Sequence, residues 1–229
     1  TVMQHTSLRP LFDAGRLWKG NATLALPVTA TGIDALNASL TGGGWPAHML
    51  IEWLTDQPES LPIECVLRTW RQHQDNRRLV LVNPPHRPCA EALMQQGLHP
   101  EQIDCIRSSA ADSAWCLEQL AQSACIASVI AWSEAINQTT QLRRLQLACQ
   151  QGQTQLFLVR DNAARRQASP APIRAQLTKT TEHSTIEVFK QPGASGKAPV
   201  SIPQVLDWVR HISPAQRKIT NHQIPLDVH

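Results

Sequence analysis

Residues 31–46 read TGIDALNASLTGGGWP in a chain of 229 residues. The apolar positions Ile33, Leu36 and Leu40 favour a short helix, and the triplet Gly42-Gly43-Gly44 ends it, because glycine is common just past a helix end. Apolar residues follow the Trp45-Pro46 pair directly. The stretch therefore predicts a helix that leads into the first central strand of a sheet.

Beyond this stretch, strand-like runs alternate with helical patterns. We expect strands at residues 49–54, 78–83, 103–107, 127–132 and 155–159. We expect helices at residues 61–73, 88–96, 112–123 and 138–151. The last helix has Leu142, Leu145 and Cys149 on one stripe, and Gly152 is expected to end it. Such alternation is typical of right-handed βαβ units and predicts an α/β fold with a mostly parallel sheet.

The two ends of the chain have different patterns. Ile173, Ala175 and Leu177 alternate with polar residues, and a similar run after a polar turn at residues 179–184 predicts an antiparallel hairpin at one sheet edge. We therefore expect an arm at residues 1–30, with a helix at 7–18, and a core domain at 31–190. A tail at 191–229 is rich in Pro, Gly and Ser, and we expect it to hold one helix near 204–211 and to be partly disordered.

Composition narrows the class of protein. With 42% hydrophobic and 17% charged residues the chain can bury a core. Its apolar runs are far shorter than the ~20 residues that cross a bilayer, so we expect a cytoplasmic protein without membrane contact. Six scattered cysteines, with no C-x-x-C pair, favour buried thiols over a zinc site or disulfides.

Residues 160–229 carry 10 Lys/Arg against 5 Asp/Glu, so the last third is basic.

Several motifs resemble a known family. Residues 31–46 resemble the entry to a RecA-like ATPase core. More narrowly, the chain between Leu17 and Lys190 resembles the ImuA family, which comprises bacterial SOS-regulated proteins associated with translesion DNA synthesis. The motifs that carry this resemblance, in order, are LWKG (17–20), GGGWP (42–46), VNPPH (82–86), AWCLEQ (114–119), VIAW (129–132), LRRLQLA (142–148), FLVR (157–160) and Pro170. Asn37 replaces the usual Asp, and Cys89 stands where an aromatic residue is more usual.

The resemblance implies a RecA-like three-layer α/β/α domain with a mostly parallel central sheet and a C-terminal antiparallel hairpin. It also implies work in the mutasome, beside an ImuB-like pseudo-polymerase and an error-prone polymerase, with RecA as a further partner. The main alternative is a SulA-type inhibitor of cell division that binds the GTPase FtsZ. SulA proteins share the strand motifs at residues 127–160, so these residues do not separate the two families, whereas residues 31–46 favour ImuA.

A third alternative is an active DNA-dependent ATPase, and the sequence argues against it. A phosphate loop needs glycines and a lysine, but the turn after the first central strand reads TDQPES at residues 55–60, with two carboxylates and no Gly or Lys. The strand that should end in a magnesium-binding acid ends in Trp132 and Ser133, and we interpret Glu134 as a solvated loop residue. The phosphate-loop look-alike GASGKA at 193–198 lacks the first Gly and the final hydroxyl residue. We expect no catalytic residue, no cofactor and no metal.

The remaining candidates are contact residues. Trp18 is a large anchor in the arm, which either packs on its own core or holds a neighbouring subunit in a homo-oligomer. Polar residues beside the apolar stripe of helix 138–151 are either a solvated face or a partner-binding face; these are Arg143, Arg144, Gln146 and Gln150. Weak contact with DNA phosphates is expected from the basic third, at Arg160, Arg165 and Arg166.

Overall fold

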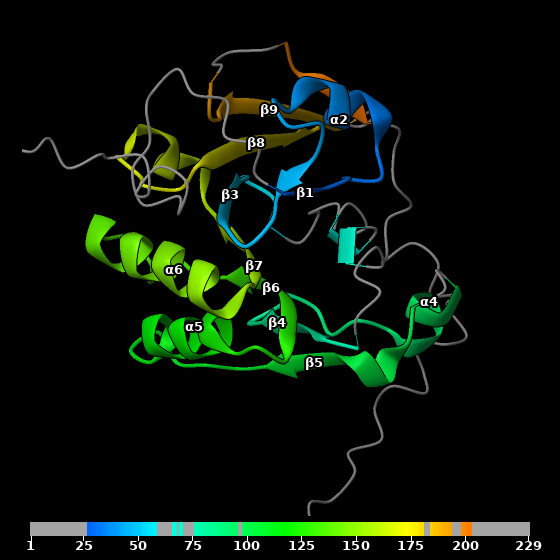
Figure 1. Ribbon diagram of the computed structural model, residues 1–229, viewed down its shortest axis with the longest axis vertical. Helices are drawn as coiled ribbons and strands as arrows, with labels where there is room; N and C mark the ends of the chain where they lie inside the picture. The colour runs from blue at the N-terminus through cyan, green and yellow to red at the C-terminus, as the bar shows by residue number, and fades with distance from the viewer. Residues whose placement is uncertain are drawn as a thin grey trace, which may run out of the picture.

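The computed structural model describes residues 27–58, 66–67, 69–70, 76–95, 98–180, 184–193 and 198–202. An eight-stranded mixed sheet has the strand order β10-β9-β8-β3-β7-β6-β4-β5. Neighbouring strands from β8 to β5 pair in parallel, and β9 and β10 are antiparallel. The sheet runs through the middle of the molecule, with α5 and α6 on one side and α4 on the other (Figure 1). The predicted α/β class and mostly parallel sheet are confirmed.

The five strands expected from the alternating pattern lie within one residue of their predicted bounds at either end. They are β3 (Leu50–Leu54), β4 (Arg78–Val82), β5 (Ile103–Ile106), β6 (Ile126–Trp132) and β7 (Gln155–Arg160). The inner strands β3, β4, β6 and β7 are buried almost throughout. Strands covered on both faces read as continuous apolar runs, which is why the sequence located them well.

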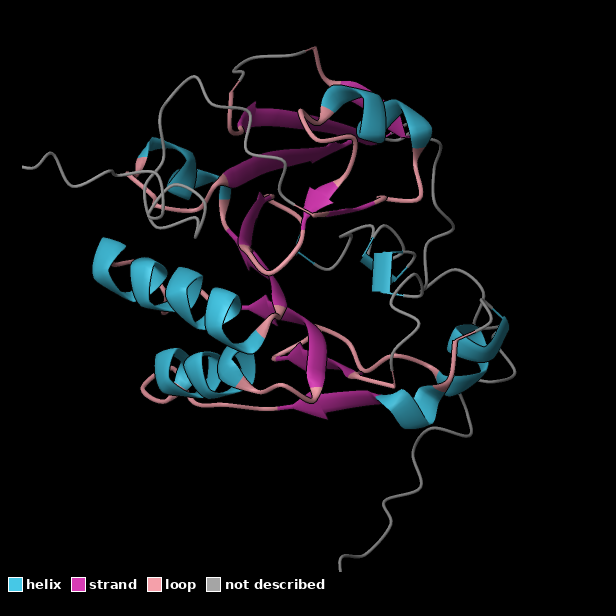
Figure 2. Ribbon diagram, in the orientation of Figure 1, coloured by secondary structure: helices cyan, strands magenta, loops and turns pink. Residues whose placement is uncertain are grey.

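Two hydrophobic cores lie on opposite faces of the sheet. Figure 2 shows the strands of the sheet in magenta and the helices beside them in cyan. The helices α5 (Ser113–Gln122) and α6 (Thr139–Gly152) cover one face and bury Leu117, Leu142 and Leu145. The other face is covered by α4 (Ala90–Gln95) and by four described residues of the predicted helix 61–73. The short helical turn η2 (Pro100–Gln102) leads into β5. The result is the three-layer arrangement expected.

The stretch at residues 31–46 forms the predicted helix, α2 (Asp34–Ser39), and then β2 (Trp45–Pro46), which pairs with β1 (Val28–Thr29). Asn37 has a local role, because its Oδ1 accepts a hydrogen bond from the Thr31 N–H at 2.8 Å. A Cβ on Gly44 would lie 2.5 Å from the Thr29 carbonyl oxygen, so the backbones of β1 and β2 approach too closely for a side chain there.

Behind this stretch, Trp45 packs against Trp53 and Phe157, with ring centroids 5.7 and 5.9 Å away. All three side chains are buried in the core on the α2 face of the sheet. Tilted and edge-on contacts of this kind add to the stabilisation that burial alone supplies. The few large aromatic residues therefore anchor the entry stretch to the central strands.

The end of α6 differs from the prediction. Gly152 is the last helical residue, and the left-handed position that ends the helix belongs to Gln153, at φ 55°. Gly152 has a packing role instead, since a Cβ there would lie 2.1 Å from the carbonyl oxygen of Ala121 on α5. The glycine lets α6 approach α5, which a pattern of helix stops does not show.

The predicted hairpin is confirmed as β8 (Ile173–Lys179) and β9 (Ser184–Lys190). Strand β1 precedes the predicted core limit at residue 31, and β10 (Val200–Ile202) extends the sheet after the limit at residue 190. The arm up to residue 26 with Trp18, the helix near 204–211 and most of the GASGKA turn lie outside the described residues. In the part of the chain that is described, no helix is long and apolar enough to span a membrane.

Candidate functional site

The carboxyl edge of the parallel sheet is where α/β proteins of this topology usually bind ligands. After β3 ends, Thr55 donates its backbone N–H to the carbonyl oxygen of Arg160 at 3.0 Å, and Asp56, Gln57 and Pro58 are exposed. Gln57 donates its backbone N–H to the Thr55 hydroxyl. These four residues present one carboxylate and no cation or glycine at the place where a phosphate loop would begin. An anionic ligand finds repulsion there instead of a cradle of N–H groups.

Trp132 is the last residue of β6, and its side chain makes a hydrogen bond to the turn after β3. Its indole Nε1–H donates to the carbonyl oxygen of Pro58 at 3.1 Å. An indole has one donor and no lone pair for a metal, so it offers nothing to magnesium. The residue that stands where the ATPase pattern needs an acid thus holds the turn after β3 by a hydrogen bond.

Two carboxylates at this edge accept hydrogen bonds from backbone N–H groups. Glu134 is exposed, as interpreted from the sequence, and its Oε1 accepts from the Asp161 N–H at 3.0 Å. The Asp161 carboxylate in turn accepts from the Ala163 N–H and begins η3 (Asn162–Arg166). Among the described residues no three His, Cys, Asp or Glu side chains lie close enough to hold a metal ion.

A buried ionic cluster lies beside this edge. Glu52 in β3 is fully buried and accepts from two arginines, with Arg160 Nη1 at 2.7 Å from Oε1 and Arg174 Nε at 2.5 Å from Oε2. Arg160 also donates to the Gln167 side chain, and Arg174 donates to backbone carbonyls of the β7–β8 connection. Two arginines on one carboxylate hold that connection against the sheet.

This cluster corrects one predicted nucleic-acid contact. Arg160 is 3% exposed, so its guanidinium cannot meet a phosphate. The FLVR pattern places an arginine at a strand end. It does not reveal that this arginine pairs with Glu52, a buried residue of β3. Sequence reasoning missed Glu52 because a lone acid in an apolar strand carries no motif.

The second predicted contact, Arg165, is half-exposed and already paired. Its guanidinium makes two hydrogen bonds to Glu187, at 2.7 and 2.8 Å, and lies 4.3 Å from the centre of the Phe189 ring. The pair raises the pKa of Arg165 and lowers that of Glu187, chiefly through these hydrogen bonds. Arg166 alone of the three predicted nucleic-acid contacts is exposed.

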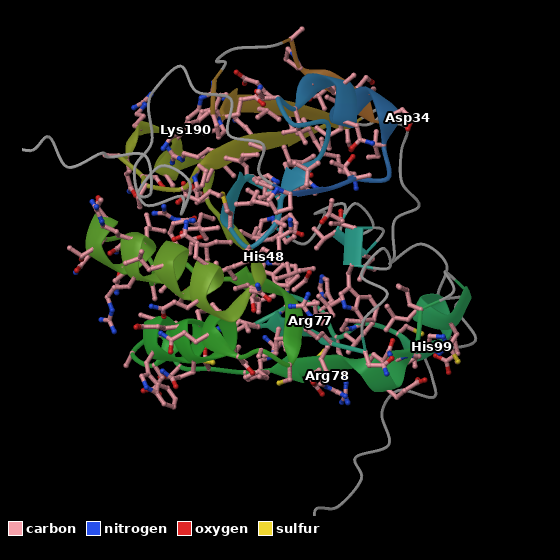
Figure 3. All side chains as sticks on the ribbon, in the orientation of Figure 1. Asp34, His48, Arg77, Arg78, His99 and Lys190 are labelled. Carbon is pink, nitrogen blue, oxygen red and sulfur yellow. The ribbon has the colours of Figure 1, made fainter. Side chains whose placement is uncertain are left out.

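Lys190 is the last residue of β9 and lies above α6 in the view of Figure 3. Its Nζ donates to the Ser169 carbonyl oxygen at 2.6 Å. Burial, and then the positive charge of Arg174, lowers its pKa. The cations of this region thus hold the β7–β8 connection in place.

On α6, the predicted partner face is only partly outward. Arg143, Arg144 and Gln150 are exposed, and Arg144 makes an ion pair with Glu118 of α5. Gln146 is a correction: its side chain is half-buried, and Oε1 accepts from the Leu50 N–H at 3.0 Å. It therefore satisfies a donor at the start of β3. Sequence reasoning passed over Trp115 and Leu147, which are exposed on these helices; their place off the apolar stripes was the available signal.

Comparisons with known proteins settle the fold. No protein-family model matches the sequence, and no curated protein matches it. Among solved structures 314 chains match. The RadB recombinase superposes with a TM-score of 0.59 over 77% of this chain and 96% of that one, at 14% sequence identity. The fold is RecA-like. At this identity the likeness concerns the fold alone.

Proposed function

We propose that this chain is a non-catalytic RecA-like accessory protein of the SOS mutagenesis machinery in the cytoplasm, and that it acts through contacts with other proteins. The observation that carries the non-catalytic part is the hydrogen bond from Trp132 to Pro58. An indole occupies the strand end at which nucleotide hydrolysis needs a metal-binding acid.

Two further observations support this proposal. The turn after β3 offers Asp56 and no lysine, so triphosphate binding has no positive partner there. The ionic groups nearby, Glu52 with Arg160 and Arg174, are committed to one another and to backbone carbonyls. A nucleotide would have to break these contacts to gain a cation from this cluster.

The choice of machinery rests on the resemblance to the ImuA family. It gives three partners, an ImuB-like pseudo-polymerase, an error-prone polymerase and RecA. The RecA-like fold is compatible with it, and RadB, which is named a recombinase, shares that fold. DNA has a minor role in this proposal, because Arg160 is buried and Arg165 is paired with Glu187.

Affinity capture of the full chain from cells treated with a DNA-damaging agent tests the proposal. Because translesion synthesis and cell division use different proteins, the captured set separates the two functions. We expect the pseudo-polymerase and the error-prone polymerase to be enriched over undamaged cells. Enrichment of FtsZ without either polymerase would replace the proposal with the SulA-type function.

Direct mixing of purified proteins provides the control for capture. The chain should bind the pseudo-polymerase or the polymerase with no nucleotide present, because no step of the contact uses ATP. Binding that requires Mg-ATP would contradict the non-catalytic assignment even if the partners were correct.

A further inference from the structure

The outward faces of α5 and α6 carry two large apolar side chains in water. Trp115 on α5 is 66% exposed and Leu147 on α6 is 51% exposed. Trp115 lies one turn before Glu118, and Leu147 lies one turn after Arg144, so each is a neighbour of the same interhelical ion pair. These four residues, with Arg143, define what we call the α5–α6 surface. Its two apolar side chains therefore share one side of the molecule.

The charges of the α5–α6 surface are unbalanced. Glu118 is the sole charged residue of α5, and Arg143 and Arg144 are those of α6. Glu118 neutralises Arg144 at an N–O distance of 2.5 Å. Among the described residues none makes a hydrogen bond or ion pair with the guanidinium of Arg143, which is exposed. The surface thus has one cation to spare beside two apolar side chains.

The rest of these two helices lacks the residues of an ordinary solvated face. Neither helix contains Lys or Asp, and the other exposed positions are mostly Gln and Thr. Protein interfaces are enriched in Trp and Arg and depleted of Lys, Glu and Asp. A tryptophan at the centre of such a surface is the residue type that most often dominates a contact.

We propose that the α5–α6 surface docks a segment of a partner protein that combines apolar side chains with an acidic residue. The apolar side chains cover Trp115 and Leu147, and the carboxylate pairs with the planar guanidinium of Arg143. This inference rests on the proposed function, since it names the face and the chemistry of a protein contact. It goes further by naming the side of the sheet that makes the contact.

Charge complementarity selects this occupant over two others. A second copy of the chain would bring a second surplus arginine to the same contact, and like charges facing each other oppose docking. Nucleic acid needs several cations for useful affinity, because its binding strength depends on the number of phosphates neutralised. One spare arginine on a surface that also exposes Trp115 and Leu147 fits a single carboxylate on an apolar segment.

Photo-cross-linking in host cells after DNA damage tests the proposal on the full chain. The variants are Trp115→p-benzoylphenylalanine and Leu147→p-benzoylphenylalanine. The control is Met94→p-benzoylphenylalanine, because Met94 is 56% exposed on α4, across the sheet. We expect positions 115 and 147 to cross-link to the same segment of one protein, identified by mass spectrometry, with an Asp or Glu among apolar residues. Position 94 should not yield that segment.

A synthetic peptide of the cross-linked segment then gives the affinity. We expect W115A and R143E each to weaken its binding at least tenfold, while Gln119→Ala, an exposed change on α5, leaves it within twofold. Both variants should retain the melting temperature of the native chain, since the changed side chains are exposed. Equal affinity for the native chain and W115A would overturn the proposal.

The outcomes separate this inference from the proposed function. A cross-link to a second copy, to DNA, or to a segment without a carboxylate overturns the docking assignment, as does the absence of any cross-link at 115 and 147. An acidic apolar segment from a protein outside the DNA-damage machinery supports the docking surface and contradicts the proposed function. Capture of the polymerase proteins that survives W115A and R143E supports the function and overturns the surface.

Discussion

Replacing Glu52 with glutamine removes the one negative charge between Arg160 and Arg174 while nearly keeping the side-chain volume. Both arginines are at most 5% exposed, so water cannot take over the role of the carboxylate. The variant leaves two buried guanidinium charges without an anion. Breaking a buried pair in this way typically costs about 3–5 kcal/mol of folding free energy.

Urea unfolding followed by circular dichroism measures this loss. We expect E52Q to lower the free energy of unfolding by about 3–5 kcal/mol with little change in the m-value. At about 2–4 °C per kcal/mol for a chain of this size, the melting temperature should fall by roughly 6–20 °C. High salt should not remove the difference, because a buried pair is little screened.

The matched control is E187Q. Glu187 also pairs with an arginine, Arg165, but the two side chains are 34% and 37% exposed, and such pairs contribute about 1 kcal/mol or less. If E52Q cost no more than E187Q, or if 1 M salt abolished its effect, the reasoning about the buried cluster would be refuted.

Three further variants or probes test other parts of the structure. G152A should destabilise the fold by about 1–3 kcal/mol in urea unfolding, because its Cβ would lie 2.1 Å from the Ala121 carbonyl oxygen; native-like stability would show that α6 can move away from α5 freely. W132F should cost about 0.5–1.5 kcal/mol through the hydrogen bond to Pro58, and no loss would mean that this bond contributes nothing. Burial raises the pKa of Cys149 to about 12, so about one thiol in ten thousand is ionised at pH 8. Mass spectrometry after brief alkylation should find exposed Cys105 modified and Cys149 unmodified until urea unfolds the chain, and early modification of Cys149 would contradict its burial.

The sequence predicted the sheet well because its inner strands are apolar runs separated by helical patterns, and burial on both faces produces that pattern. It also predicted the α2 stretch. The glycines there are needed for a positive φ at Gly43 and for the close approach of Gly44 to the Thr29 backbone. Sequence reasoning missed β10 because three residues give no period. The prediction for Gly152 gave it the wrong role. This glycine allows α6 to approach α5, whereas the left-handed residue that ends the helix is Gln153.

The site was less accessible to sequence reasoning, because the decisive facts are pairings between distant residues. From the sequence Arg160 was interpreted as an exposed cation at a strand end. In the fold it is buried and pairs with Glu52, 108 positions away. Gln146 looked outward, yet it accepts from the Leu50 backbone. The loss of nucleotide motifs could be read directly, but the Trp132 contact with Pro58 required the fold. Trp115 and Leu147 could have been noticed as apolar residues off the predicted stripes.

Melting the full chain with and without millimolar Mg-ATP tests the central claim, that this RecA-like fold works without nucleotide chemistry. We expect the same melting temperature in both conditions and no release of phosphate. A ligand at a hundred times its Kd stabilises a protein by about 2.7 kcal/mol, which in a chain of this size raises the melting temperature by roughly 5–10 °C. A rise of that size with Mg-ATP, absent with magnesium alone, would show that the fold binds nucleotide and would contradict this claim.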